Sequence, residues 1–339
     1  MQSTLRKVWA SPAWRIGLGL AIGLILLLLA ARAFDWQQTW LTLKSADLYM
    51  VLLAIFSVGL TITLKTARWQ VLMSPRGENV GFRIALMALL TAQTINWFLP
   101  ARVGDLSRVV VVGNSGPGKI FILGTIAIEK FFDMLSYGIL LLYLFFLIPL
   151  PDWLANSAVG FLSITIIITV GLTILVAYPD IVVNIITRFT SWIPEKLRLR
   201  INEWLQSGLA SIDVLRGTRK LAIITFITAC IWACALWTVH LAAQAIHLNI
   251  PWSASLTTLV FLQAGISLPS IPGRIGIFQY LCILALKIFD IDQSIALGFG
   301  ILLQAIVLIP PTLISLPLFG ILGLSNNRRD IFKPTNNLD

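Results

Sequence analysis

The sequence predicts an all-α, polytopic integral membrane protein, and two observations carry this prediction. Of 339 residues, 58% are hydrophobic and only 12% are charged, whereas an average soluble domain has about 45–50% apolar and about 25% charged residues. The 53 residues from Leu221 to Gly273 include no Asp, Glu, Lys or Arg. A straight helix of that length would run about 80 Å, far beyond a hydrocarbon core about 30 Å thick. This stretch must therefore fold back within or across the bilayer.

Apolar stretches bounded by charges, proline or glycine predict about eight membrane-spanning helices and two broken or re-entrant helix pairs. The first stretch follows Arg6, Lys7 and Arg15, and we interpret it as a retained helix. Its 16-residue uncharged core also resembles a cleaved signal peptide. The predicted helices are 14–34, 46–66, 82–98, 102–113, 119–150, 156–177, 220–247, 254–270, 274–289 and 292–324.

The segment 178–219 is more polar than the helices around it. Basic residues such as Arg198 and Arg200 alternate there with Leu197 and Trp204. This pattern is typical of amphipathic helices that lie on the membrane interface. An ordinary solvated loop fits the composition equally well, so both interpretations stay open.

The two broken helix pairs share a short pattern of residues. Aligned on proline, Leu99-Pro-Ala-Arg-Val-Gly104 matches Ile271-Pro-Gly-Arg-Ile-Gly276, which lies 172 residues later. The offset is about half the chain, and each match falls at the corresponding break of its half. This indicates an internal duplication, with a first membrane repeat at 1–150, a second at 151–325 and a cytoplasmic tail at 326–339.

The distribution of positive charge predicts how the repeats are oriented. Each half has three net crossings, so the second half is inverted relative to the first and both termini lie inside. Of 25 Lys and Arg residues, 18 fall in predicted cytoplasmic segments, Lys65 and Arg68 among them. Only Arg32, Lys44 and Lys287 fall outside. This bias follows the positive-inside rule, which explains the net charge of +10 without a nucleic-acid partner.

Four basic residues remain within the membrane or at the breaks, together with three acids. Ionisable groups at membrane depth are costly, so they are expected to line a cavity, to pair with one another, or both. These residues are Arg102, Arg108, Lys130 and Arg274, with Asp105, Glu129 and Asp133.

Substrate contact is the role we favour for Arg102 and Arg274, with Arg108 and Asn96 as further candidates. Each break starts a short helix whose N-terminal amides favour an anion. A guanidinium beside such amides suits phosphate, because its planar fork donates two hydrogen bonds at once. The expected hinge residues of the two breaks are Pro100, Gly104, Pro269, Pro272, Gly273 and Gly276.

The acidic residues have two open interpretations. Asp105 is three residues from both Arg102 and Arg108 and is expected to pair along one helix. Glu129 and Asp133 are four residues apart, so their like charges repel unless a cation or proton compensates. They either pair with Arg102 or Arg108 or carry a coupling proton, and Lys130 belongs to the same charge network. For Asn96 the favoured role is satisfying backbone groups freed at the first break.

Three motifs resemble those of a known family. They are Asn96-x-x-Leu-Pro-Ala-Arg-x-Gly-Asp-Leu-x-Arg108, Glu129-Lys-Phe-Phe-Asp133 and Pro272-Gly273-x-Ile-Gly276. Together they resemble the lysylphosphatidylglycerol synthase transmembrane-region family, also called flippase-like membrane proteins, and the likeness covers nearly the whole chain. The resemblance implies a multi-pass inner-membrane protein of bacteria or archaea that translocates an anionic or glycosylated lipid.

The chain also departs from that family. The second motif usually resembles Pro-Gly-Gly-x-Gly followed by an acid, whereas this chain has Arg274 and Gln279, which puts a coupling role for this site in doubt. Family members that synthesise the lysyl lipid carry a soluble aminoacyl-transferase domain after the membrane part. This chain continues only briefly past Leu324, so synthesis is not expected.

The expected function is movement of a phosphate-bearing lipid or lipid-linked sugar between leaflets, without enzymatic activity, cofactor or metal. The expected partners are the bilayer, its phospholipids or a lipid-linked sugar, and a possible second copy in a homodimer. A rival interpretation is a membrane glycosyltransferase that uses Asp290-Ile-Asp292 to hold a metal or as a base. A third is an accessory subunit that does not transport.

Overall fold

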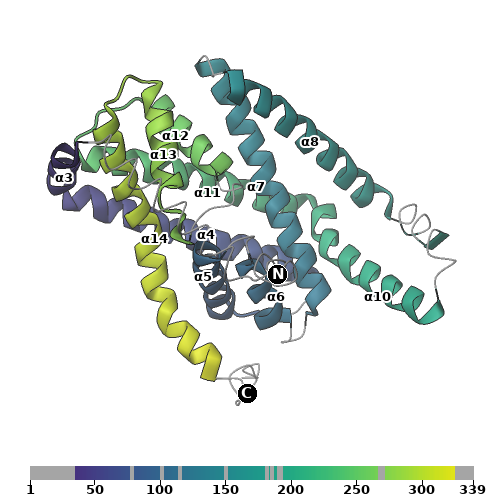
Figure 1. Ribbon diagram of the computed structural model, residues 1–339. Helices are drawn as coiled ribbons and strands as arrows, with labels where there is room; N and C mark the ends of the chain where they lie inside the picture. Colours follow the sequence, from purple (N-terminus) through teal and green to yellow (C-terminus); the bar gives the residue numbers. More distant parts are fainter. Residues whose placement is uncertain are drawn as a thin grey trace, which may run out of the picture. The chain divides into compact units, whose positions relative to one another are not determined.

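The fold is known from a computed structural model, which describes residues 35–76, 80–99, 103–113, 117–148, 152–179, 183, 187–188, 194–265 and 272–324. Within these ranges the chain forms eleven α-helices, short 3-10 turns and no strand. The all-α prediction is therefore confirmed for this part of the chain (Figure 1). The predicted helix 14–34 and the tail 326–339 lie outside the described residues.

The chain divides into two compact units. Unit 1 comprises 1–56, 96–102 and 236–309, and unit 2 comprises 57–95, 103–235 and 310–339. Each unit draws on both predicted repeats, so the sequence boundary between 150 and 151 does not coincide with the boundary between the units. The assignment of two inverted repeats stays a prediction.

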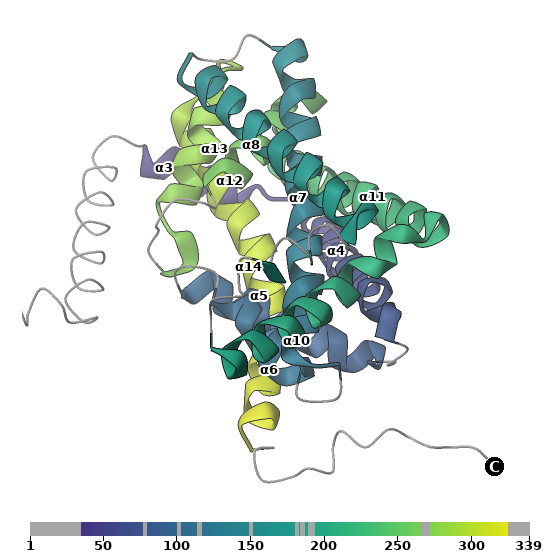
Figure 2. The same ribbon diagram turned by 90° about the vertical axis from the view of Figure 1, so that its right-hand side faces the viewer.

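Unit 1 contains helices α3 (Trp36–Lys44), α12 (Trp252–Gly265), α13 (Ile277–Lys287) and the first part of α14 (Gln293–Leu324). Helix α12 packs along α13, as Figure 2 shows. A Cβ on Gly265 would lie 2.0 Å from a methyl carbon of Leu281, so glycine permits this close approach.

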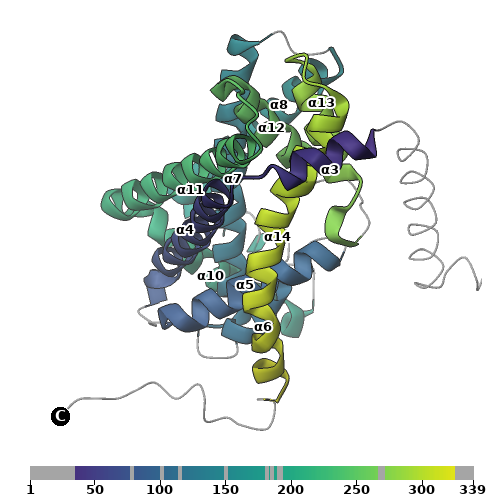
Figure 3. The same cartoon turned by 90° about the vertical axis from the view of Figure 1, so that its left-hand side faces the viewer.

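Helix α3 crosses the start of α14 in Figure 3, and the sequence did not predict it. The carboxylate of Asp35 caps α3 by accepting hydrogen bonds from the amides of Gln37 and Gln38. The hydroxyl of Thr39 donates to the carbonyl of Ser294 over 3.2 Å. Gly298 lies against Thr42, where an added Cβ would meet the threonine methyl at 3.2 Å.

Unit 2 is built around α7, with α6, α8 and α10 packed against it. Its core includes Trp69, Phe121 and Ile122, all with no exposed surface. The helices that contribute to unit 2 are α4 (Leu48–Met73), α5 (Phe82–Phe98), α6 (Gly104–Gly113), α7 (Lys119–Leu147), α8 (Asp152–Ala177), α10 (Glu195–Ile212) and α11 (Thr218–Ala245).

Five of the described helices are long and apolar enough to cross a membrane, which supports a multi-pass membrane protein. Their spans are Leu48–Met73, Lys119–Leu147, Val159–Ala177, Thr218–Ala245 and Gln293–Pro317. The last one stays helical through three prolines, which spanning helices tolerate because neighbouring groups satisfy the freed carbonyls. The predicted number of about eight spans and the re-entrant pairs stay predictions.

Two differences from the predicted elements matter for the site. The prediction that the second helix ends at 66 is wrong, because α4 continues to Met73. Arg68 is therefore a helix residue with no exposed surface and not part of a cytoplasmic loop. The segment 178–219, left open between interfacial helix and loop, contains the 18-residue helix α10.

Candidate functional site

Five of the seven charged residues predicted at membrane depth gather in unit 2, where Arg68 joins them in a cluster that connects α4, α6 and α7. The ion cluster consists of Arg68, Asp105, Arg108, Glu129, Lys130 and Asp133. Helical spacing explains why they meet: residues three or four apart on α6 and on α7 lie on one face of their helix.

The pair between Arg108 and Glu129 is the most buried part of the ion cluster. The Nη2 of Arg108 donates to Oε2 of Glu129 over 2.7 Å, and Nη1 donates to Oε1 over 3.3 Å. Their side chains are only 2% and 4% exposed. The guanidinium also lies 3.9 Å from the ring centroid of Trp69, a favourable cation–π arrangement. This bidentate geometry holds Arg108 in one orientation.

Arg68 brings α4 into the ion cluster. Its Nη2 lies 2.8 Å from Oδ1 of Asp133 and 3.9 Å from Oε1 of Glu129. Its Nη1 donates to the hydroxyl of Thr228 on α11 over 3.1 Å. Arg68 thus faces both like charges on α7. Of the two partners expected from the sequence, Arg108 does pair with Glu129, and Arg68 is an additional partner that the sequence did not predict. A proton-coupling role for Glu129 and Asp133 stays a prediction.

Lys130 and Asp133 form the accessible side of the ion cluster. The ammonium of Lys130 lies 3.4 Å from Oδ2 of Asp105 and 3.9 Å from Oε1 of Glu129. Its side chain is 38% exposed, and that of Asp133 is 29% exposed. Asp105 also approaches Arg108 at 3.8 Å, so its predicted pairing along α6 is confirmed.

Basic side chains outnumber acidic ones around the ion cluster. Three cations face three carboxylates within it, and Lys65 stands one helical turn before Arg68. Four basic side chains therefore accompany three acidic ones. Lys130 is the basic side chain of the cluster that an anion can approach, because it is 38% exposed.

The described part of the second predicted break lies in unit 1 and includes a 3-10 turn, Pro272–Arg274, before α13. Gly273 and Gly276 have φ of 77° and 87°, and Arg274 has φ of 57°. Only glycine adopts this region at little cost, so Arg274 is held in a strained conformation. Its guanidinium lies 4.8 Å from the ring centroid of Trp97.

Two glutamines tie the turn to α14. The backbone N–H of Gly276 donates to Oε1 of Gln279 over 2.8 Å. The amide of Gln279 donates to Gln304, and Nε2 of Gln304 donates to the carbonyl of Gly273 over 2.6 Å. Backbone groups released by the break are thereby satisfied within the protein, as membrane burial demands.

The structure brings parts of the two predicted breaks together in unit 1. Trp97 follows Asn96 on α5, and its ring packs against the guanidinium of Arg274. The ring centroids of Trp97 and Phe278 are 6.3 Å apart. Asn96 and Arg274 are both half-buried and both have partners. Gly104 begins α6 and is buried. Pro100, Arg102 and Pro269 lie outside the described residues, as does the side chain of Pro272.

The acidic pair proposed for a glycosyltransferase has a structural role at one of its two residues. Oδ1 of Asp292 accepts from the amides of Ser294 and Ile295 over 2.8 and 3.4 Å, which caps the start of α14. Asp290 adopts a φ of 56° just before it. Among the described residues, no group of three His, Cys, Asp or Glu side chains is placed to hold a metal ion.

Sequence reasoning missed Lys65, Arg68 and Trp97. Lys65 and Arg68 were counted as loop charges because they follow a long apolar run. The signal against that interpretation was the continuing sequence Trp69-Gln-Val-Leu-Met73, which is helix-compatible and apolar. Trp97 offered no signal in the sequence, because its partner lies 177 residues away.

One of the comparisons with known proteins matches most of the chain. A family model described as "Lysylphosphatidylglycerol synthase TM region" matches residues 16–315. The search of curated proteins found no match. The matched range includes every residue of the ion cluster and both predicted breaks.

Proposed function

We infer, because this chain belongs to the lysylphosphatidylglycerol synthase TM-region family, that it moves an anionic, phosphate-bearing lipid across the inner membrane. The family and the apolar helices give a multi-pass membrane protein linked to lipids. The proposed substrate is a phospholipid or lipid-linked sugar whose phosphate passes the charged residues while its tails stay in the bilayer. We propose a carrier and no group-transfer chemistry.

The excess of basic over acidic side chains around the ion cluster, with Lys130 exposed, is the observation that carries this proposal. Two helices of the cluster, α4 and α7, are candidate membrane spans. Arg108 and Arg68 both form buried ion pairs with carboxylates and set the geometry, whereas Lys130 is the more exposed cation. An ionised group at membrane depth is costly and marks a pathway by default. Lys130 would therefore receive the phosphate as it passes.

Arg274 supports the proposal as a second cationic contact. Its ring partner Trp97 holds one face of the guanidinium, and the strained turn leaves it at the start of α13. Broken helices near the bilayer middle are typical of carriers that bind a substrate between repeats. Alternating access would follow from rocking one repeat against the other.

A vesicle assay tests this function. Purified protein is reconstituted with a headgroup-labelled fluorescent phosphatidylglycerol, and an added reductant quenches the outer leaflet only. Wild-type protein should carry the inner-leaflet probe to the outer leaflet, where the reductant also reaches it. The fluorescence of both leaflets is then lost. Arg274→Gln and Lys130→Gln should each slow this step by about tenfold or more, since a hydrogen bond to a charged group contributes about 1.5–3 kcal/mol.

Lys287→Gln is the matched control for Arg274→Gln. It removes one positive charge from the last turn of α13, the helix that follows the break, at the end away from Arg274. Its rate should stay within about twofold of wild type. If wild type leaves the inner leaflet protected, or if both site variants run at the wild-type rate, the proposed function is wrong.

A further inference from the structure

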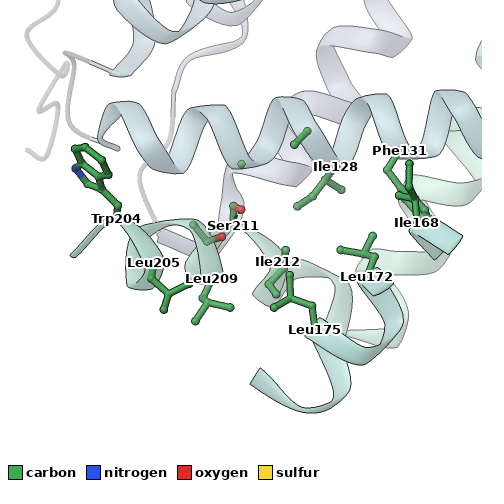
Figure 4. A pocket seen from close by; sticks show the side chains of 13 residues that line it. Ile128, Phe131, Ile168, Leu172, Leu175, Trp204, Leu205, Leu209, Ser211 and Ile212 are labelled. Carbon is green, nitrogen blue, oxygen red and sulfur yellow. Dashed lines mark hydrogen bonds between the residues drawn. The ribbon is translucent and has the colours of Figure 1, made fainter. Parts of the chain in front are cut away.

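An apolar groove runs between α7, α8 and α10 in unit 2. Its volume is about 470 Å³, in the range of about 300–1,000 Å³ typical of ligand pockets. Its walls are almost entirely carbon, as Figure 4 shows. The α7 wall is Gly124, Ala127, Ile128 and Phe131, the α8 wall is Ile168, Leu172 and Leu175, and the α10 wall runs from Trp204 to Ile212.

The surroundings of the groove point to lipid and not to water. Helices α7 and α8 are both candidate membrane spans, and α8 exposes large apolar side chains such as Ile164 and Ile167, which are 56% and 69% exposed. Water does not fill a cavity that offers it few hydrogen-bond partners. A groove of this chemistry inside a bilayer is filled by hydrocarbon.

One end of the groove carries an aromatic ring and positive charge. Trp204, which is 53% exposed, marks that end in Figure 4. Arg200 lies four residues before Trp204 and eight before Gly208, so the three share one face of α10. Arg198 lies seven residues before Leu205 and eleven before Leu209, so it shares a face of α10 with those two leucines. Neither arginine forms an ion pair with a residue that the structure describes.

We propose that this groove holds one acyl chain of an anionic phospholipid from the surrounding bilayer. The chain lies between α7, α8 and α10, and its phosphate meets Arg200 beyond Trp204. Tryptophan and arginine suit this position, because an amphipathic ring and a cation both prefer the membrane interface. This lipid is a bound component distinct from the transported one, so the site stands apart from the ion cluster.

Filling the groove tests the proposal directly. A Cβ on Gly208 meets no atom within 4 Å, so Gly208→Leu occupies the groove without a clash against the backbone. Ala127→Leu fills it from the α7 wall. Gly171→Leu is the matched control, because Gly171 on α8 also has open space around it but does not line the groove.

The measurement is native mass spectrometry of protein purified in mild detergent and mixed with phosphatidylglycerol or phosphatidylcholine. Wild type and Gly171→Leu should retain one phosphatidylglycerol, and both filling variants should lose at least about tenfold in retention. Thermal unfolding identifies a variant that fails to fold, in which case the other filling variant decides. Undiminished retention in a folded filling variant overturns the proposal.

Arg200→Gln tests the headgroup. It should remove the preference for phosphatidylglycerol over phosphatidylcholine while leaving the acyl chain bound. A diazirine group on the acyl chain should label Ala127 and Leu209, as read by peptide mass spectrometry. Labelling confined to the outer face of α8, or a second protein chain cross-linked through these residues, would assign the groove to another occupant and refute the proposal. None of these outcomes depends on transport.

Discussion

Replacing Glu129 with Gln isolates the energetic role of the ion cluster. The substitution keeps the size of the side chain but removes the charge that faces Arg108 at 2.7 Å. Removing one partner of a buried ion pair costs about 3–5 kcal/mol, because the remaining charge stays buried without compensation. Asp105 lies 3.8 Å from the same guanidinium, so we expect the lower end, about 3 kcal/mol.

The double variant Glu129→Leu with Arg108→Met should recover most of this loss. Replacing both partners of a buried pair by apolar residues is often neutral or stabilising. Each remaining charge keeps a partner, since Arg68 retains Asp133 and Lys130 retains Asp105. We therefore expect the free energy of unfolding of the double variant to lie within about 1 kcal/mol of the wild-type value.

The assay is equilibrium unfolding in mixed micelles, followed by circular dichroism. Asp213→Asn is the control, because its pair with Arg216 is also a charge pair but both side chains are about half exposed. Exposed pairs contribute about 0–1 kcal/mol. If Glu129→Gln lowers the free energy of unfolding by less than about 1 kcal/mol, as the control does, the cluster is not a buried and energetically coupled network.

Three further changes test the packing and the break. Gly124→Ala should destabilise the protein by about 1–3 kcal/mol, because the added Cβ would lie 2.1 Å from Oγ of Ser211. Chemical unfolding measures this loss against the control Gly208→Ala, whose added Cβ meets open space. Gln279→Glu should cost about 1–3 kcal/mol by replacing the amide donor to Gln304 with a carboxylate, and thermal unfolding should show no such loss for an exposed Gln→Glu change. Asp292→Ala should cost about 0.5–2 kcal/mol through the lost helix cap, seen as a lower unfolding midpoint, and an unchanged midpoint would contradict the capping role.

The sequence predicted the helices well because hydrophobic runs and their boundaries are local features. The run 82–98 was predicted with the bounds that α5 has, and the start of α7 at Lys119 was also correct. The predicted end of the second helix failed because we interpreted Lys65 and Arg68 as loop charges. A buried cation looks like a loop residue until its acidic partners are known, and those lie on α7, more than sixty residues away.

The candidate site was predictable only in part. Spacing alone gave the pairing of Asp105 with Arg108, since i and i+3 positions share a helix face. Arg108 was one of two candidate partners for Glu129, and the structure selects it. The contacts of Arg68 with Asp133 and of Arg274 with Trp97 were not available from spacing. Such contacts depend on how helices pack, which a hydrophobic pattern does not encode. The sequence placed charges on helices and left their partners open.

Selection of an anionic headgroup by the basic residues of the ion cluster is tested most directly by a ratio of rates. Labelled phosphatidylglycerol and phosphatidylcholine are compared in otherwise identical vesicles containing wild type or Lys130→Gln. Wild type should move phosphatidylglycerol at least about tenfold faster, corresponding to about 1.4 kcal/mol, and Lys130→Gln should bring the ratio towards one. Equal rates for the two lipids in wild type would contradict the role assigned to the cluster.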